Sequence, residues 1–272
     1  MKNTLSIAQA QMPVLSDRAA CLEYLHRTAE QSVKANASLL CLPEMFCCPY
    51  DIRLFSRYAE EEGGSLWTEC SRIARNYHIF FSAGTMPELD EHGRIYNTAY
   101  VFSPDGSLAA KYRKMHLFDI DLPGRQTFQE SAVLSPGEKV TVFDTEFGPI
   151  GLAICFDIRF PEQFRLMAAK GARVVIAPAS FNMTTGPDHW ELLYRAQSLN
   201  SQCFLIGTAP ARDETSSYVS WSHSIITDPW GRVVSQAGYT EELRITGIDL
   251  GQADEIRTQI PSFPDSRIHL SE

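Results

Sequence analysis

Cys155 is the residue of this chain that is best placed for covalent chemistry. It ends the short apolar run 151–155, which has the length of a buried strand, and the polar stretch after it leads to Pro161, a favoured first residue of a helix. A thiol at such a corner meets backbone N–H groups that stabilise an anion, which would lower its pKa and support nucleophilic attack. On position alone, a buried structural cysteine is the more common interpretation.

Two charged residues favour the nucleophilic over the structural interpretation of Cys155. Glu44 follows another apolar run, 39–42, and Lys114 lies in the basic segment 111–117, just after a strand-like stretch. In layered α/β folds, binding and catalytic sites assemble where strands end. Each residue alone would be interpreted as a solvated surface charge, but the thiol, the carboxylate and the ammonium at three strand ends together match a known pattern.

Three segments of the chain resemble the carbon–nitrogen hydrolase (nitrilase-like) superfamily. They are Leu-Pro-Glu at 42–44, Tyr-Arg-Lys-Met-His-Leu at 112–117 and Gly-Leu-Ala-Ile-Cys-Phe-Asp-Ile-Arg-Phe-Pro-Glu at 151–162. The resemblance covers nearly the whole chain and implies a nucleophile at Cys155, a base at Glu44 and a cation for the oxyanion at Lys114. The family also places a second glutamate after the lysine, which hydrogen-bonds the lysine or the substrate. Glu130 occupies that place, with a solvated loop carboxylate as the competing interpretation.

Within the superfamily the chain is most similar to the omega-amidases, which hydrolyse the terminal amide of α-ketoglutaramate and α-ketosuccinamate. The similarity lies in Pro49-Tyr50 and in 116–124, 127–131 and 181–190. A hydrolase of deaminated glutathione is an alternative, but those relatives carry a different residue at Phe118 and lack Asn182. A nitrilase shares the three catalytic residues. The non-enzyme alternatives are an inactive α/β scaffold, although no catalytic position is lost, and a flavodoxin-like binding module, although no glycine-rich phosphate loop follows the first strand.

Hydrolysis of an amide needs a nucleophile, proton transfer and stabilisation of an oxyanion. Glu44 would take the thiol proton, give one to leaving ammonia and then activate water against the thioester. We therefore expect Glu44 to be buried near Cys155, with a raised pKa. The backbone N–H of Phe156 is the natural second donor to the oxyanion, because it follows the nucleophile at the turn.

A carboxylate-bearing substrate needs a further cation, since Lys114 is committed to the oxyanion. Arg159 is the candidate, with Tyr50 as a hydrogen-bond donor to the substrate; a salt bridge that braces the corner is an equally weighted role for Arg159. Histidines are the commoner partners of catalytic thiols. We interpret the three in question as structural or surface residues: His116, His189 and His223.

Composition excludes several classes of protein. The 272 residues carry a formal net charge of −9, which disfavours a nucleic-acid binder because phosphate contacts need clustered Lys and Arg. No apolar run has the length of a membrane span, and the first residues lead directly into a strand pattern, so we expect neither a membrane partner nor a signal peptide. The seven cysteines show no zinc-like spacing, which favours a reduced, cytoplasmic protein without metal or cofactor.

Hydrophobic periodicity and turn residues predict the elements around these residues. Strands are expected at 5–12, 38–42, 79–84, 97–102, 108–112, 151–155, 174–177, 204–208, 224–227, 233–236 and 243–249. Helices are expected from Asp17 onward and over 65–77, 161–170 and 188–200, with Asp17 and Ser65 as caps. The first helix should turn one face inward, made of Leu22, Leu25, Ala29 and Val33. The stretch 116–138 has little periodicity and is expected to be a functional loop.

This order of elements fits two mixed sheets, each covered by helices and stacked face to face, although the pattern alone does not separate it from a doubly wound sheet. The resemblance implies a four-layer α-β-β-α sandwich. We assign residues 1–272 to a single domain with a C-terminal tail from about residue 252. The helix after Cys155 and the apolar residues of the tail are expected to form the contact of a homodimer or higher homo-oligomer; those tail residues are Ile256, Ile260, Phe263 and Ile268.

Overall fold

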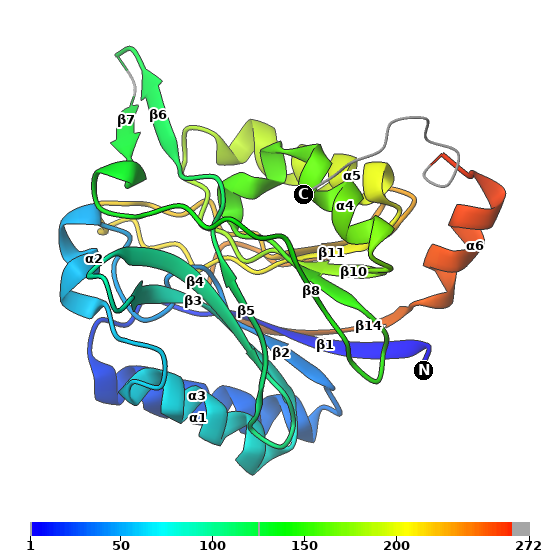
Figure 1. The fold of residues 1–272 in the computed structure, drawn as a ribbon, viewed down its shortest axis with the longest axis horizontal. Helices are drawn as coiled ribbons and strands as arrows, with labels where there is room; N and C mark the ends of the chain where they lie inside the picture. Colours follow the sequence, from blue (N-terminus) through cyan, green and yellow to red (C-terminus); the bar gives the residue numbers. More distant parts are fainter. Residues whose placement is uncertain (1, 125, 263–272) are drawn as a thin grey trace.

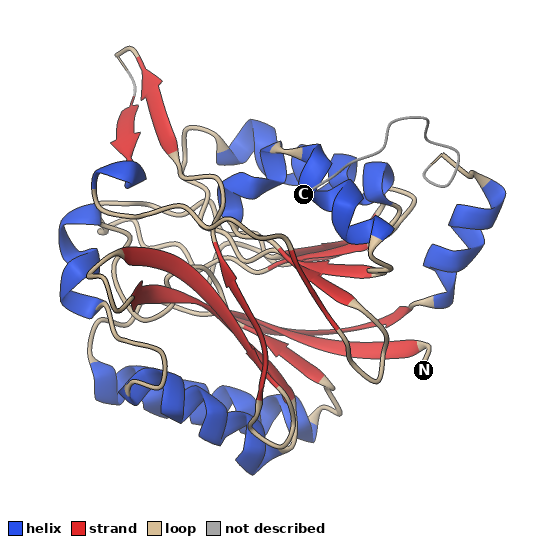
Figure 2. Ribbon diagram, in the orientation of Figure 1, coloured by secondary structure: helices blue, strands red, loops and turns tan. Residues whose placement is uncertain are grey.

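Two six-stranded sheets lie face to face, and helices cover their outer faces (Figures 1 and 2). The computed structural model describes residues 2–124 and 126–262. Sheet one has the spatial order β14 (Glu242–Asp249), β1 (Thr4–Gln11), β2 (Leu39–Cys41), β3 (Phe80–Leu89), β4 (Ile95–Phe102) and β5 (Leu108–Arg113). Sheet two has the order β13 (Val233–Gln236), β12 (Ile225–Thr227), β11 (Phe204–Gly207), β10 (Val174–Ile176), β9 (Ile150–Leu152) and β8 (Thr141–Phe143).

The helices complete the four layers. Helices α1 (Arg18–Lys34) and α3 (Ser65–Tyr77) pack on sheet one, and α4 (Pro161–Ala169) and α5 (Gly186–Ser201) pack on sheet two (Figure 1). The expected α-β-β-α sandwich is therefore confirmed. In each sheet the central strands are parallel, β1-β2-β3 in one and β9-β10-β11 in the other. Parallel strands end at a common edge, which brings the residues that follow them together.

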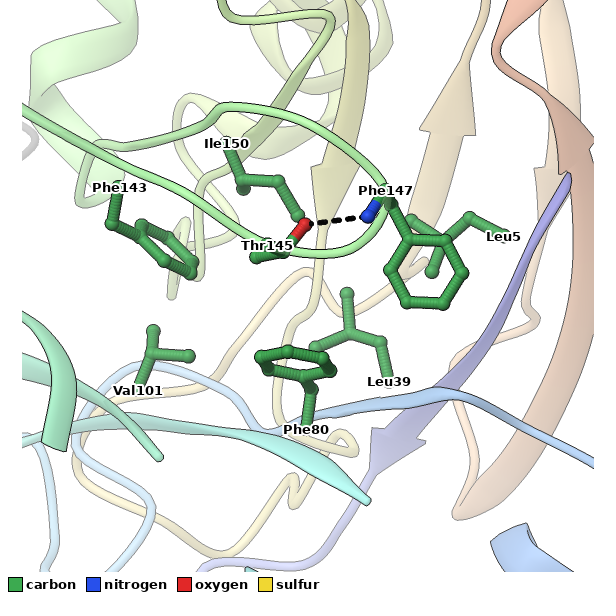
Figure 3. A pocket seen from close by; sticks show the side chains of 8 residues that line it. All are labelled: Leu5, Leu39, Phe80, Val101, Phe143, Thr145, Phe147 and Ile150. Atoms are coloured by element: carbon green, nitrogen blue, oxygen red, sulfur yellow. Dashed lines mark hydrogen bonds between the residues drawn. The ribbon is translucent and has the colours of Figure 1, made fainter. Parts of the chain in front are cut away.

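Alternation along the strands divides the apolar side chains between two cores. In β2, Leu39 and Cys41 face the second sheet, whereas Leu40 faces the helices of its own sheet. Figure 3 shows part of the region between the sheets, where Leu39 and its neighbours lie opposite Phe143 and Ile150. These side chains leave no space for a water molecule, so this part of the inter-sheet layer is a packed core and not a ligand cavity.

Helix caps and faces agree only partly with the sequence-based expectations. Asp17 caps α1 as predicted, accepting the N–H of Ala20 at 2.8 Å. The prediction for Ser65 is wrong: Gly64 is the N-cap of α3, and the carboxylate of Glu60 accepts the N–H of its second residue, Leu66, at 2.9 Å. On α1, Leu25 and Ala29 are buried, Leu22 is half-buried and Val33 is exposed, because the buried face is turned from the expected one and consists of Cys21, Tyr24, Leu25, Thr28, Ala29 and Ser32.

Several elements lie where no regular structure was expected. The stretch 116–138 contains a hairpin, β6 (Asp119–Leu122) and β7 (Gln126–Gln129), that projects from the body, followed by the 3-10 turn η1 (Glu130–Ala132) (Figure 1). A short helix α2 (Ile52–Tyr58) precedes α3, and α6 (Gly251–Gln259) forms most of the described part of the tail. Ile256 is half-buried and Ile260 exposed, while Phe263 and Ile268 lie outside the described residues. Within the described ranges, no helix combines the length and apolarity needed to cross a membrane.

Candidate active site

Cys155 stands at a sharp corner between sheet two and helix α4. The chain leaves β9, passes Ala153 and Ile154, and enters the 3-10 turn η2 (Cys155–Arg159) that leads into α4. The N–H of Cys155 donates to the carbonyl of Pro178 at 3.0 Å, and its φ of 46° lies in the left-handed region. A non-glycine residue adopts this conformation at a cost in energy and is typical of functional corners. The side chain is 5% exposed.

Asp157 holds the corner in place. Its fully buried carboxylate accepts the N–H of Ile154 at 2.8 Å, the hydroxyl of Tyr112 at 2.7 Å and the N–H of His116 at 3.0 Å. The Nδ1 of His116 lies 2.8 Å from the same carboxylate, and the imidazole stacks on Phe160 with ring centroids 3.6 Å apart. His116 is thus tied to Asp157, in agreement with its interpretation as a structural histidine.

Glu44 follows β2 and is almost completely buried. Its Oε1 accepts the amide of Asn97 at 2.8 Å, and its Oε2 accepts the N–H of Ser180, in the loop after β10 of the other sheet, at 2.9 Å. Gly84, at an irregularity of β3, allows this approach: its φ is 50°, and a Cβ there would lie 2.0 Å from the carbonyl oxygen of Pro43. Only glycine fits both the left-handed backbone and the close contact.

Lys114 lies immediately after β5 and bridges two carboxylates. Its Nζ is 3.0 Å from Oε1 of Glu44 and 2.9 Å from Oε2 of Glu130, and none of the three side chains is exposed to solvent. Glu130, the first residue of η1, also accepts the N–H of Phe118 at 2.7 Å and the hydroxyl of Tyr50 at 2.5 Å. The structure therefore brings Glu44, Lys114, Glu130 and Cys155 together from four separate segments.

The charges of this cluster shift one another. Burial raises the pKa of Glu44; Lys114 opposes that shift, and Glu130 adds to it. Burial acts to lower the pKa of Lys114, but the carboxylates of Glu130 and Glu44 outweigh it and raise that pKa. Burial, and next the carboxylate of Glu44, raise the pKa of the Cys155 thiol, whereas Lys114 acts in the opposite direction. The expected lowering of the thiol pKa by the corner is therefore wrong, because desolvation and a neighbouring carboxylate both disfavour the thiolate.

A neutral thiol in contact with a carboxylate is a starting state for proton transfer. The thiol of Cys155 lies close enough to the carboxyl group of Glu44 for each group to shift the pKa of the other, and the pKa of Glu44 is raised. A raised pKa makes a carboxylate a better base, so Glu44 can accept the thiol proton as the sulfur attacks. Lys114 lies close enough to both groups to interact with either negative charge.

The three residues expected to bind substrate have different surroundings. Tyr50 is buried, and its hydroxyl faces the two glutamates, 2.5 Å from Glu130 and 3.2 Å from Glu44. Phe156 is half-buried, and its ring meets that of Phe118 at 5.3 Å. The backbone N–H groups on either side of Phe156 already have acceptors within the protein. The N–H of Cys155 donates to the carbonyl of Pro178, and the N–H of Asp157 donates to the carbonyl of Ile154.

Arg159 is half-buried and has no carboxylate partner among residues 2–124 and 126–262. Its Nη1 lies 3.3 Å from Nδ1 of His189, its guanidinium carbon is 5.4 Å from the rings of Phe156 and Phe181, and its buried Nε has no hydrogen-bond partner there. Burial lowers the pKa of Arg159. The salt bridge considered for this residue is absent from that part of the chain, since the oxygens of Asp157 are occupied by other donors.

Three residues of the site carry no sequence motif that we recognised. Asn97 and Ser180 position Glu44, and the ring of Tyr218 packs against that of Tyr50 in a tilted arrangement, with ring centroids 4.7 Å apart. A signal existed for Asn97, because an asparagine within the apolar strand 95–102 is unfavourable for a sheet unless its amide has a partner. Ser180 and Tyr218 lie in loops without such a signal.

The fold and this buried set of thiol, carboxylate and ammonium define the class of protein. The chain belongs to the carbon–nitrogen hydrolase family, whose model matches residues 4–258. The suggested resemblance is therefore confirmed over nearly the whole chain.

Individual proteins similar to this chain narrow the comparison beyond the family. The protein named omega-amidase NIT2 of Mus musculus is 42% identical over 268 residues, which cover 98% of this chain and 97% of that protein. The Homo sapiens protein of the same name is 45% identical over 240 residues, 88% of this chain and 87% of that one. Among solved structures, Nit3 of Saccharomyces cerevisiae, a member of branch 10 of the nitrilase superfamily, has a TM-score of 0.90 and 36% identity, with 98% of each chain covered.

Proposed function

We propose that this protein is an omega-amidase: one catalytic domain that hydrolyses the terminal amide of a short dicarboxylate monoamide, such as α-ketoglutaramate, to 2-oxoglutarate and ammonia. The observation that carries the proposal is the fully buried contact of Lys114 with Glu44 and Glu130 beside the thiol of Cys155, in a chain 42% identical to omega-amidase NIT2 of Mus musculus. The site holds a nucleophile, a base and a cation within one contact network, as amide hydrolysis requires.

The first half of the reaction forms a thioester. Glu44 takes the proton of Cys155 while the sulfur attacks the amide carbon, and the carbonyl oxygen becomes an oxyanion. The ammonium of Lys114 and the N–H of Phe156 stabilise that charge. Glu44 then returns the proton to the leaving nitrogen, the carbon–nitrogen bond breaks, and ammonia departs.

The second half releases the acid. Glu44 deprotonates a water molecule, whose oxygen attacks the thioester carbon, and the same two donors stabilise the second oxyanion. The carbon–sulfur bond then breaks, and the proton held by Glu44 returns to the sulfur. Glu130 exchanges no proton in this scheme: its carboxylate, 2.9 Å from the ammonium, holds Lys114 in position.

The free carboxylate of the substrate is assigned to Arg159. Its guanidinium lies between the rings of Phe156 and Phe181 beside the corner of Cys155, its Nε has no hydrogen-bond partner in the described chain, and burial strengthens its attraction for an anion. Arg159→Lys keeps the charge but loses the planar fork, so we expect the KM for α-ketoglutaramate to rise more than that for a neutral short amide. Equal effects on both substrates would show that Arg159 only supports the corner.

A substrate panel tests the function. Purified protein is given α-ketoglutaramate, α-ketosuccinamate, neutral amides, nitriles and deaminated glutathione, and ammonia or amine release is measured. We expect the two keto-acid amides to have the highest kcat/KM. A preference for deaminated glutathione or for nitriles would instead assign the chain to one of those hydrolases. Acid quenching during turnover, followed by intact-mass measurement, should detect the acyl group on Cys155.

We also infer a homodimeric protein of the cytoplasm. Exposed apolar side chains gather on the outer face of α5 and on the β12–β13 hairpin, which supports α5 as a subunit contact in addition to the expected α4; they are Leu192, Leu199, Trp230, Val233 and Val234. The seven free cysteines favour a reducing compartment. Light scattering should give twice the 30.5 kDa chain mass, and a fully active species at that chain mass would contradict a dimer.

A further inference from the structure

His189, in the first turns of helix α5, is the polar neighbour of Arg159. Nη1 of Arg159 lies 3.3 Å from Nδ1 of His189, and this is the one hydrogen bond of the guanidinium within residues 2–124 and 126–262. Guanidinium nitrogens only donate, so Nδ1 of His189 accepts this bond and carries no proton. The imidazole therefore gives Arg159 an acceptor that has no negative charge.

The lack of charge on this acceptor matters for an anion site. An aspartate or glutamate in the place of His189 would bind the guanidinium and neutralise it. The oxygens of Asp157, two residues before Arg159, are occupied by other donors. The positive charge of Arg159 thus remains available to a ligand, close enough to the sulfur of Cys155 for the two groups to interact.

The contact with His189 also determines which edge of the guanidinium is free. The guanidinium carbon lies 5.4 Å from the rings of Phe156 and Phe181, but attraction to a ring face fixes no particular N–H direction. A hydrogen bond does fix one, and here it occupies Nη1. The opposite edge, formed by Nε and Nη2, presents two parallel N–H groups to a carboxylate, and its buried Nε has no partner in the described chain.

Helix α5 holds His189 in a fixed place relative to the corner. The next residue, Trp190, is fully buried, and its indole N–H donates to a backbone carbonyl at 2.7 Å. Two turns later, the amide of Gln197 donates to the carbonyl of Ile158 at 2.9 Å. Since Ile158 immediately precedes Arg159, the helix and the corner are joined directly beside the Arg–His contact.

We propose that His189 is a positioning residue that orients the Nε–Nη2 edge of Arg159 toward the free carboxylate of the substrate, and so determines the preference for anionic over neutral amides. This inference rests on the proposed function, in which Arg159 binds that carboxylate. Arg159 supplies the charge, and His189 supplies its direction without cancelling it. The contact lies outside the set of Cys155, Glu44 and Lys114, so it should affect KM more than kcat.

Three substitutions that all branch at the γ atom test this role. His189→Leu removes the acceptor, His189→Asn keeps a neutral acceptor at the δ position, and His189→Asp adds a negative charge there. KM and kcat are measured for glutaramate and glutaramide, which have equal length and differ in one carboxylate. The exposed His92, in the turn between β3 and β4, provides the matched control His92→Leu, which should change neither KM.

The expected results form an ordered series. The KM for glutaramate should rise by about tenfold or more in His189→Leu, less in His189→Asn and most in His189→Asp, whereas the KM for glutaramide should change little. Equal increases for both amides would show that His189 only supports the fold. An asparagine no better than leucine would exclude the acceptor role, and an aspartate no worse than asparagine would exclude an anion at Arg159; each of these three results overturns the proposal.

A measurement without turnover separates this inference from the proposed activity. Iodoacetamide alkylates Cys155, and 2-oxoglutarate bound at Arg159 should slow that reaction in the wild type. The concentration that gives half-protection should increase in the same order, from wild type to asparagine, leucine and aspartate. Such a series in a protein without amidase activity would refute the proposed function alone, whereas wild type that 2-oxoglutarate does not protect would refute the positioning role.

Discussion

Replacing Lys114 by methionine tests the electrostatic design of the site. Methionine fills a similar volume, so the change removes mainly the ammonium. In the wild type that ammonium lies 3.0 Å from Glu44 and 2.9 Å from Glu130, with all three side chains inaccessible to solvent. The variant would leave two carboxylates buried side by side without a cation.

The expected magnitude follows from that burial. Removing one partner of a buried ion pair costs about 3–5 kcal/mol, because the remaining charge is left desolvated. For a chain of this size, each kcal/mol lowers the Tm by about 2 °C, so a fall of roughly 6–10 °C is expected near neutral pH. Activity should fall by a factor of about 10³ or more, because the oxyanion loses its cation.

The direction in which the stability deficit of Lys114→Met changes with pH tests the reasoning more strictly than its size at one pH. The pKa of Lys114 is raised in the folded protein, so its contribution is fully present below the unfolded-state pKa of about 10.5 and does not vary between pH 5 and 8. The pKa of Glu44 is also raised, and removal of Lys114 should raise it further. A carboxyl group of this kind stabilises the fold below its unfolded-state pKa of about 4.5 and loses that contribution as pH rises through its folded-state pKa. The deficit of Lys114→Met should therefore be smaller at pH 5 than at pH 8.

Differential scanning calorimetry at pH 5, 6, 7 and 8 measures this deficit. Lys34→Met is a matched control, because the exposed pair of Lys34 with Glu30 should contribute within about 0.5 kcal/mol. An unchanged Tm for Lys114→Met, or a deficit equal at pH 5 and pH 8, would refute the electrostatic reasoning.

Three further predictions concern the nucleophile, the backbone and metal ions. Cys155→Ala should abolish amide hydrolysis but change the free energy of unfolding by about 1 kcal/mol or less, because one buried sulfur is lost; measurable turnover would refute the mechanism. Gly84→Ala should lower the free energy of unfolding by more than about 2 kcal/mol and displace Glu44, since the new Cβ would lie 2.0 Å from the carbonyl oxygen of Pro43. Gly93→Ala is the control: Gly93 has a φ of 78° and nothing within 4 Å of the new Cβ, so this change should cost about 1–2 kcal/mol and leave activity unchanged. Addition of EDTA should not change the rate, because side chains supply the nucleophile, base and cation; inactivation that a divalent metal reverses would contradict this.

The sequence determined much of the fold because local patterns there agree with the tertiary structure. Apolar runs of strand length predicted all the central strands, because the burial of a strand is visible in its pattern of apolar residues. The N-cap of α1 at Asp17 was predicted correctly, because a cap depends on local hydrogen bonds. The positions of Glu44, Lys114 and Cys155 at strand ends were also visible, because each follows a short apolar run. The four-layer arrangement itself came from the family resemblance.

Only the tertiary structure decided how the site is completed. Tyr50 was expected near the substrate from its place in the chain, and only the structure shows that its hydroxyl faces Glu130, which is 80 residues away in the chain. Tyr218 and Ser180 reach the cluster from loops whose sequences carry no periodic signal. The direction of the thiol pKa also required the structure, because desolvation and the nearby carboxylate of Glu44 outweigh the local effect of the corner. Sequence patterns report which side chains are buried and where strands end, but long-range hydrogen bonds and pKa shifts depend on distances that exist only once the two sheets have packed.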